Sequence, residues 1–296
     1  MAACSVRRLT DRISLIEDPH GARVPFCHCL YIDDDRRTLI DTSCGKPLVN
    51  TVKPLGVDLV LLTHFHEDHI LNVDAFDEAD ILVHPLDADG VRTTDGFKKL
   101  TGLLDFGTPE MGQAFVDLFK LKNYRVTRGY EAKETFDLGH TEVQLVHTPG
   151  HTAGHCSFYF PQHELVYSGD IDLTRFGPYY GGLGCDADDF ITSIDRLRDM
   201  QPRILVSAHR GVITEKIGER LDKYKTKIFE RDEKLLAALS NGPLDLFQLG
   251  ERYVFYGKPR RIELYDHFER MCVRVHMNRL IKAGLVGLDG KLYYRV

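Results

Sequence analysis

The chain has 296 residues, of which 43% are hydrophobic and 28% charged, and its formal net charge is −6 at pH 7. This length suits a large α/β domain with a small accessory one, and the acidic balance argues against nonspecific nucleic-acid binding by the whole molecule. No apolar stretch approaches the roughly 20 residues that span a bilayer, the N-terminus lacks an apolar signal segment, and the seven cysteines include no CxxC pair. We therefore expect a cytoplasmic protein without membrane contact.

The N-terminal part, residues 11–42, has the pattern of paired β-strands. Apolar strand-like segments cover 12–16, 27–32 and 38–41, and an acidic-basic turn separates the last two. The sequence Cys27-His28-Cys29 allows a metal-binding interpretation, because two thiols two residues apart point to one side of a strand. Since a single histidine is the only further ligand nearby, we expect a structural role for this segment.

A dense group of potential metal ligands follows the apolar segment 57–62, which predicts a buried strand. Residues two apart in an extended chain point to the same side, so His64 and His66 are expected to face one ion. Asp68 and His69 follow where the chain turns, within reach of a second ion. Imidazole nitrogens and carboxylates suit zinc, with iron or manganese as alternatives. A surface histidine-rich loop is the competing interpretation, and the buried strand before it disfavours that.

The next segment predicts a strand over 81–85 and then a helical, aromatic insertion over 86–133. His84 has no clustered partner, so we expect it to be structural. Phe115 and Phe119 are spaced as on one face of a helix. The insertion is either a peripheral pair of packed helices or an apolar wall above the metals, and the sequence leaves both open.

Three further candidate ligands each follow a short strand-like segment and stand near glycine, which allows close backbone approach to an ion. They are His151 after 141–147, Asp170 after 164–167 and His209 after 203–206. His155 is better placed to support a ligand than to be one. Asp172 competes with Asp170.

The loop that follows Asp170 is rich in glycine and aromatic residues. Tyr179 or Tyr180 is a candidate to donate a hydrogen bond to a substrate carbonyl or to the oxyanion that develops from it. The alternative is a phenol that anchors the loop.

The C-terminal part, residues 216–296, changes character. A helix over 186–200 is expected to close the preceding domain. Helices over 215–239 and 264–283 follow, and then a hairpin over 285–294 with an Asp289-Gly290 turn. Helices followed by a hairpin are typical of a winged-helix module, with 264–283 in the position of a recognition helix. From residue 230 onward the chain holds 12 Lys and Arg against 9 Asp and Glu, so this segment is at +3 and the rest at −9. A cap or dimerisation role is the default expectation, and nucleic-acid binding the less favoured one.

Four motifs stand in order along the first 215 residues: HxHxDH at 64–69, PGHT at 149–152, SGD at 168–170 and SAHRG at 207–211. As a set they resemble the metallo-β-lactamase-fold hydrolase superfamily, most closely its glyoxalase II and lactonase branch. The resemblance implies an αββα sandwich and two divalent metal ions. The chain departs from the family pattern in lacking an asparagine near His28 and a glycine pair after the first motif.

Carried over by position, the resemblance assigns a role to each candidate. It implies that the first metal is held by His64, His66 and His151, the second by Asp68, His69 and His209, with Asp170 bridging the two. Asp58 matches an acidic position that orients a ligand histidine in the family.

The predicted organisation is a catalytic α/β domain over 1–215 and a helical linker with a winged-helix-like domain over 216–296. Two adjacent cations lower the pKa of a bridging water toward about 7, so hydroxide forms at neutral pH and attacks a small ester, thioester or lactone. Asp68 is expected to accept a proton and pass it to the leaving group. A small-molecule substrate and a homodimer are the expected partners.

Two alternatives for the function remain open. The order of catalytic domain and tail also resembles the β-lactamase-like protein 2 type, which implies a metal-dependent endoribonuclease acting on single-stranded RNA. Redox chemistry with iron is less favoured, because no flavin-binding domain follows the core.

Overall fold

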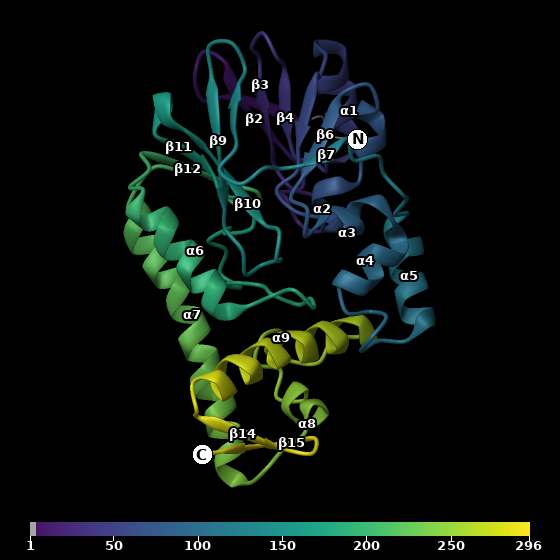
Figure 1. Ribbon diagram of the computed structural model, residues 1–296, viewed down its shortest axis with the longest axis vertical. Coiled ribbons are helices and arrows are strands. Elements are labelled where there is room, and N and C mark those ends of the chain that lie inside the picture. Colours follow the sequence, from purple (N-terminus) through teal and green to yellow (C-terminus); the bar gives the residue numbers. More distant parts are fainter. Residues whose placement is uncertain (1–3) are drawn as a thin grey trace.

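The computed structural model describes residues 4–296, apart from the side chains of residues 46 and 47. Two β-sheets face each other and helices cover the outer side of each sheet (Figure 1). This is the αββα arrangement that the motifs predicted. Helix α9 lies below both sheets in this view, and a small hairpin forms the C-terminal end of the molecule.

The first sheet has the strand order β1-β2-β3-β4-β5-β6-β7. Strands β1 to β4 are antiparallel, whereas β4 to β7 run parallel. The strands are β1 (Ser5–Arg8), β2 (Ile13–Glu17), β3 (Cys29–Ile32), β4 (Thr38–Ile40), β5 (Leu59–Leu61), β6 (Asp80–Val83) and β7 (Arg128–Gly129).

The second sheet has the order β13-β12-β11-β10-β9-β8, with only the β11–β12 pair parallel among the described strands. Its strands are β8 (Thr135–Asp137), β9 (Glu142–His147), β10 (Cys156–Phe160), β11 (Leu165–Tyr167), β12 (Ile204–Ser207) and β13 (Gly211–Ile213).

The helices connect and cover these strands. The α-helices are α1 (Gly45–Val52), α2 (Glu67–Ile70), α3 (Ala88–Arg92), α4 (Thr94–Leu100), α5 (Pro109–Phe119), α6 (Ala187–Asp199), α7 (Ile217–Ala238), α8 (Leu246–Gly250) and α9 (Glu263–Lys282). Four 3₁₀ helices are described: η1 (Lys53–Leu55), η2 (Val73–Phe76), η3 (Pro161–His163) and η4 (Leu239–Asn241). The expected helical insertion is thus α3 to α5, after which the chain rejoins the first sheet as β7.

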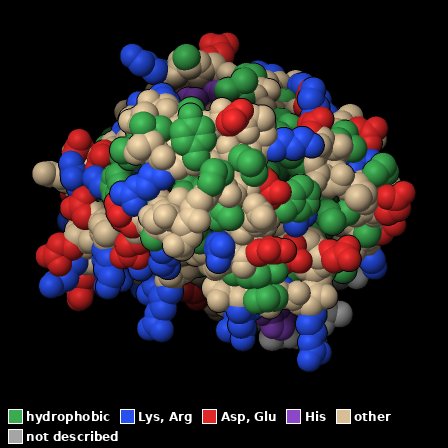
Figure 2. Space-filling model, turned by 90° about the horizontal axis from the view of Figure 1, so that it is seen from below, with side chains coloured by type: hydrophobic (Ala, Val, Ile, Leu, Met, Phe, Trp, Pro, Cys, Tyr) green, Lys and Arg blue, Asp and Glu red, His purple; other side chains and the backbone are tan. Residues whose placement is uncertain are grey.

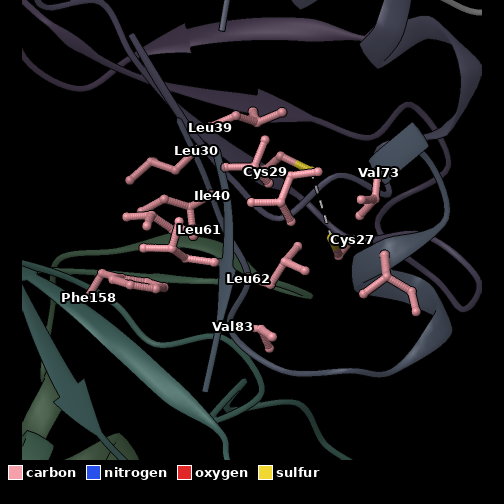
Figure 3. Close-up of a cluster of buried hydrophobic side chains, with 14 of the residues drawn as sticks. Cys27, Cys29, Leu30, Leu39, Ile40, Leu61, Leu62, Val73, Val83 and Phe158 are labelled. Atoms are coloured by element: carbon pink, nitrogen blue, oxygen red, sulfur yellow. Dashed lines mark hydrogen bonds between the residues drawn. The ribbon is translucent and has the colours of Figure 1, made fainter. Parts of the chain in front are cut away.

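The packed core between the two sheets holds the strands in place, and with them the loops that follow the strands. Leu30, Ile40 and Leu61 of the first sheet and Phe158 of the second are fully buried in one cluster (Figure 3). Cys27 and Cys29 belong to this cluster with their sulfurs 3.8 Å apart. Their burial matches the structural role expected for them, because apolar burial is the main stabilising term of such a sandwich.

A second core joins the outer face of the second sheet to the C-terminal part. Side chains of α6 and α7, such as Phe190 and Leu221, pack with Leu205 of β12 and with Val273 and Leu280 of α9. Asp186 caps α6 by accepting hydrogen bonds from two backbone amides of its first turn.

The C-terminal hairpin consists of β14 (Val286–Asp289) and β15 (Leu292–Arg295). Because Asp289 pairs with Leu292, the two-residue turn is Gly290-Lys291, one residue later than the predicted turn. Glycine suits this turn because Gly290 has a φ of +59°. The assignment of residues 216–296 as a winged-helix module stays a prediction. No helix among the described residues is long and apolar enough to cross a membrane.

One buried carboxylate makes folding stability depend on pH. Asp34 accepts hydrogen bonds from the backbone and the ring of His140, and Arg12 lies 3.7 Å away. Burial acts to raise the pKa of Asp34, but hydrogen bonds from Thr141 and His140 outweigh it and lower the pKa from 3.8 to about 2.

We expect Asp34→Asn to lower the free energy of unfolding at pH 7 by about 1–2 kcal/mol. A depressed pKa stabilises the fold above the unfolded value of 3.8, and this contribution is lost as pH falls toward about 2. Urea denaturation at stepped pH should therefore show the two proteins converging below pH 4. A gap that persists undiminished at pH 2 would contradict this assignment.

Candidate metal centre

The candidate ligands meet at one edge of the sandwich because each follows the end of a strand. His64 and His66 follow β5, and α2 begins directly after them. His151, Asp170 and His209 follow β9, β11 and β12 of the opposite sheet. Both sheets thus contribute loops to one site, which is where open α/β sheets place ligands.

The first group of ligands consists of three imidazole nitrogens that point at one another. His151 Nε2 lies 3.0 Å from His64 Nε2 and 2.8 Å from His66 Nδ1, and the last two are 3.0 Å apart. Asp170 Oδ2 is 3.3 Å from His151 Nε2. These four residues form one group able to hold a metal ion.

The second group shares Asp170 with the first. Asp170 Oδ1 lies 3.0 Å from His69 Nε2 and 3.3 Å from His209 Nε2. Asp68 closes the group, with its carboxylate 3.8 Å from His69 Nε2 and 3.4 Å from His209 Nε2. Each oxygen of Asp170 therefore faces a different group, which is the geometry expected of a bridging carboxylate. All seven residues predicted as ligands come together.

The ligand atoms of the cluster are better arranged to bind a pair of cations than to form hydrogen bonds with one another. His69 Nε2 and Asp170 Oδ1 are buried and lie 3.0 Å apart, yet within residues 4–296 neither atom makes a well-directed hydrogen bond. An unpartnered polar atom this deeply buried costs free energy unless a ligand satisfies it. Nitrogen and carboxylate donors in this mixture are those that zinc, iron and manganese accept.

The hydrogen bonds made by the second nitrogen of two ligand rings also support a metal site. His151 Nδ1 donates to the carbonyl of Tyr179 at 2.8 Å, and His209 Nδ1 donates to the carbonyl of Ala22 at 2.7 Å. A carbonyl oxygen only accepts, so in each neutral ring the proton is on Nδ1 and the Nε2 lone pair faces the cluster. These are the tautomers that a metal ligand needs.

The charges of the cluster are balanced internally in the metal-free protein. Burial opposes ionisation of His209, yet Asp170 and Asp68 outweigh it and raise the His209 pKa to about 10. Burial likewise raises the Asp170 pKa, but the rings of His209, His69 and His151 hold it well below its usual range. In the metal-free protein, protonated histidine thus supplies the positive charge that metal ions would supply, and metal binding would release these protons.

The carboxylate that orients a ligand histidine is Asp41 and not Asp58. Asp41 Oδ2 accepts a hydrogen bond from His69 Nδ1 at 2.8 Å, and both Asp41 oxygens accept from Thr63. Thr63 in turn lies 2.9 Å from His64 Nδ1. The sequence-based assignment of this role to Asp58 was wrong, because Asp58 lies at the surface in a two-pronged ion pair with Arg37.

Two more residues that support the ligands hold the loops. Asp87 accepts from Thr152 Oγ1 at 2.6 Å and from the amide of Gly154 at 2.8 Å, which fixes the loop that carries His151. His155 accepts from the amide of Asp170 at 3.1 Å, in the supporting position expected for it. A Cβ at Gly169 would lie 2.6 Å from the His155 ring, so only glycine allows this approach.

A cavity of about 740 Å³ opens above the metal centre. Its floor includes ligand residues of both groups, and its walls come from the loops 21–24 and 174–181, from α5 and from α9. The aromatic insertion therefore forms a wall above the site, which decides between the two interpretations of residues 86–133. The volume lies within the range of about 300–1,000 Å³ that is typical of small-molecule sites.

The two candidate tyrosines lie in different places. Tyr179 lines the cavity, whereas Tyr180 is fully buried and is absent from the described lining. The Tyr180 hydroxyl lies 2.6 Å from His276 Nε2, and His276 Nδ1 lies 2.6 Å from Asp232. The expectation that Tyr180 contacts substrate was therefore wrong, and the alternative of a loop anchor holds for it.

We expect Tyr180→Phe to lower the free energy of unfolding by about 1–2 kcal/mol, because it leaves the buried His276 Nε2 without its partner and removes one of the acceptors of Arg231. The kcat of the folded protein should stay unchanged. Tyr179→Phe is the matched comparison, since it alters a hydroxyl in the cavity instead. Thermal denaturation together with steady-state kinetics measures both effects, and a loss of kcat confined to Tyr180→Phe would contradict the placement.

Comparison with protein families decides the classification. The model of the metallo-beta-lactamase superfamily matches residues 22–209, which include all seven candidate ligands. The chain belongs to the metallo-β-lactamase superfamily. The matched part is accordingly a metal-dependent hydrolase domain, as the motifs predicted.

Several curated relatives of this superfamily member are similar at low identity. An atrochrysone carboxyl ACP thioesterase of Aspergillus chevalieri is 24% identical over 244 residues, covering 79% of this chain and 68% of that protein. An acyl-coenzyme A thioesterase MBLAC2 of Gallus gallus is 25% identical over 154 residues, covering 50% and 53%. A beta-lactamase-like protein 2 homolog of Drosophila melanogaster is 24% identical over 264 residues, covering 84% and 80%.

The alignments cover 52% of the beta-lactamase-like protein 2 homolog of Caenorhabditis elegans and 80% of that of Drosophila melanogaster. Among solved structures, the metallo-beta-lactamase family protein TTHA1429 from Thermus thermophilus superposes with a TM-score of 0.79 at 24% identity. The superposition covers 98% of this chain and 100% of that one. At this identity the likeness shows a shared fold that includes the C-terminal elements.

Proposed function

We propose that this protein is a two-metal hydrolase acting on small thioesters, esters or lactones, with thioesters as the preferred class. The observation that carries the proposal is Asp170, which faces His151 with one oxygen and His69 and His209 with the other, at the floor of a cavity of small-molecule size. Two thioesterases among its relatives support the choice of thioesters.

The reaction follows from how the residues are arranged. Bound as a pair, divalent cations would polarise the substrate carbonyl and lower the pKa of water toward about 7. The ligand rings are held rigidly by Asp41, Tyr179 and Ala22, so little reorganisation is needed when the substrate binds. Asp68 lines the cavity and is placed to accept a proton and return it to the leaving group. Zinc is our proposed metal, with iron and manganese as alternatives.

The C-terminal part supports a small-molecule substrate over RNA. Arg274 bonds to the carbonyl of Gly182, Arg279 pairs with Asp232, and His276 is buried. These three basic residues of α9 are thus engaged in contacts within the molecule, whereas the exposed Lys282 lies 3.6 Å from Asp188. Figure 2, which views the C-terminal end, shows acidic and basic side chains interspersed over this face. A phosphate backbone would need a concentrated positive surface.

Asp68→Asn tests the proposed role of its carboxylate. We expect turnover of a thioester to fall by roughly 10²–10³-fold, because asparagine accepts no proton, together with weaker binding of metal. The assay uses zinc-loaded protein with acetyl-coenzyme A, an aryl acetate, a γ-lactone and labelled single-stranded RNA.

Each outcome of this panel bears on the proposal. Hydrolysis of one of the small substrates that is lost in Asp68→Asn supports it. RNA cleavage with no activity on the small substrates overturns it in favour of the endoribonuclease. Near-normal rates in Asp68→Asn would remove Asp68 from the reaction while leaving the metal cluster in place.

A further inference from the structure

The cavity above the metal centre has walls of two chemically different kinds. One wall is aromatic and aliphatic and comes from two helices: Phe115 and Phe119 of α5 face Leu264, Tyr265 and Phe268 of α9. The other wall is formed by the loops 21–24 and 174–177, and each of these contributes an arginine.

The apolar wall is continuous and packed. The Phe115 and Phe119 rings lie 4.7 Å apart, and the Phe268 ring lies 6.0 Å from Phe115 and 6.3 Å from Tyr179. Phe268 and Leu264 are only partly buried, so they present apolar surface to the cavity. A substrate group that lies here gains by leaving water in proportion to its own apolar area.

The two arginines of the other wall, Arg23 and Arg175, are exposed at the cavity. Within the described part of the chain, neither makes an ion pair or a side-chain hydrogen bond, in contrast to Arg37 and Arg128, which pair with carboxylates. Arg23 directly follows Ala22, whose carbonyl accepts from the metal-centre residue His209. Two uncompensated guanidinium groups therefore flank the entrance beside the second group of ligands.

The carboxylates of the cavity do not satisfy these arginines. Asp68 and Asp170 are committed to the histidines of the cluster at the floor, and Asp172 accepts from the amide of Thr174. Glu67 also lines the cavity, and it makes no described ion pair with Arg23 or Arg175. The forked guanidinium group matches phosphate and carboxylate geometry and binds them by charge-assisted hydrogen bonds. The free arginines thus mark a place for an anionic part of the substrate.

We propose that the substrate is an amphiphilic acyl thioester, with its acyl chain against α5 and α9 and a phosphate of its thiol leaving group at Arg23 and Arg175. This rests on the proposed function and specifies its substrate. Water adds its oxygen to the acyl carbon, the carbon–sulfur bond breaks, and the departing thiolate takes up a proton. The products are a carboxylate and a phosphate-bearing thiol. That phosphate belongs either to coenzyme A or to the phosphopantetheine arm of a carrier protein.

Variants that remove the charge of Arg23 or Arg175 test whether these residues bind a phosphate at the entrance of the cavity. Arg23→Gln and Arg175→Gln are expected to raise the KM for octanoyl-coenzyme A by about fivefold each, the upper range for an exposed ion pair. Neither should change the KM for octanoyl-N-acetylcysteamine, an uncharged thioester with the same acyl group. Arg220→Gln on α7 is the matched control, because it removes an exposed arginine outside the cavity lining.

The apolar wall is tested by chain length. The kcat/KM should rise from acetyl- to octanoyl-coenzyme A, initially by roughly fourfold per buried methylene. Leu264→Asp should abolish that rise, because it places a charge on the wall that the longer acyl chain contacts.

The outcomes separate this proposal from the proposed function. Hydrolysis of octanoyl-coenzyme A with a KM that depends on neither arginine overturns the entrance and leaves the hydrolase intact. No hydrolysis of any thioester overturns the acyl-thioester proposal, and no hydrolysis of any thioester, ester or lactone overturns the proposed function as well. A loss of RNA cleavage in the arginine variants overturns the proposal and assigns the arginines to RNA. Comparison of octanoyl-coenzyme A with octanoyl carrier protein identifies the source of the phosphate, with an arginine-dependent KM for either one supporting the proposal.

Discussion

Asp170→Asn is expected to lower kcat/KM by more than the roughly 100-fold that loss of a supporting residue costs at a metal site. Asp170 approaches ring nitrogens of both groups, His151 with Oδ2 and His69 and His209 with Oδ1. An amide keeps the shape but presents one oxygen and no charge, so one of the two groups loses its donor. The metal content should fall below two ions per chain, as measured by elemental analysis.

Asp172→Asn is the matched control for that change. Asp172 lies two residues further along the same loop and accepts from the amide of Thr174 at 2.9 Å. It belongs to none of the described groups able to hold a metal. Its amide variant should retain two metals per chain. Equal metal loss in both variants would show that the loop, and not the Asp170 carboxylate, determines binding.

The second large effect is expected at Asp41. Its carboxylate bonds His69 Nδ1 at 2.8 Å, and it also accepts from Thr63 and Tyr167. Asp41→Asn weakens the hold on the His69 ring and removes a buried charge that favours metal binding. We expect a loss of about 10–100-fold in metal affinity or activity. Titration of the metal-free protein with zinc, followed by a thioesterase assay, measures both.

Asp58→Asn provides the contrast for Asp41. The Asp58 side chain is 38% exposed and pairs with Arg37 at the surface, although it stands next to β5 in the sequence. Its replacement should leave metal affinity unchanged, because an exposed ion pair contributes little. If Asp58→Asn weakens metal binding as much as Asp41→Asn does, the assignment of the orienting carboxylate is wrong.

The seven candidate ligands were predictable because their signals are local. His64 and His66 are two residues apart in an extended segment, so their side chains share one side of the chain. His151, Asp170 and His209 each follow a strand, and the ends of neighbouring strands meet at one edge of a sheet. The αββα fold followed from the same motifs and was confirmed.

Asp41 was missed because its role depends on contacts across the fold. It stands 28 residues before His69 and has a φ of +59°, a conformation that is uncommon outside glycine but is adopted more often by asparagine, aspartate and histidine than by other residues. That backbone geometry directs the carboxylate toward the cluster. Periodicity and spacing contain no signal for this role of Asp41. Asp58 lies near the HxHxDH motif in the sequence and was therefore assigned the role instead.

Tyr179 and Tyr180 show a second limit of the sequence. Adjacent residues of an irregular loop face different directions, so one phenol reached the cavity and the other the core with His276 and Arg231. Because both tyrosines belong to the same loop rich in glycine and aromatic residues, the sequence did not distinguish their roles. The buried network around Tyr180 joins α7 to α9, two elements that become neighbours only in the folded chain.

The role of the C-terminal part also emerged from packing. Its helices were predictable from their periodicity, but the contribution of Leu264 and Phe268 to the cavity was not, since it requires α9 to cross beneath the loops of both sheets (Figure 1). A homodimer stays a prediction.

The most direct test of a two-metal thioesterase is the metal content of the purified wild-type protein, measured together with octanoyl-coenzyme A hydrolysis before and after chelation. We predict two divalent ions per chain, loss of hydrolysis when they are removed, and its return when zinc is restored. Protein that contains no metal after zinc loading, or hydrolyses the thioester equally well without it, would contradict the account.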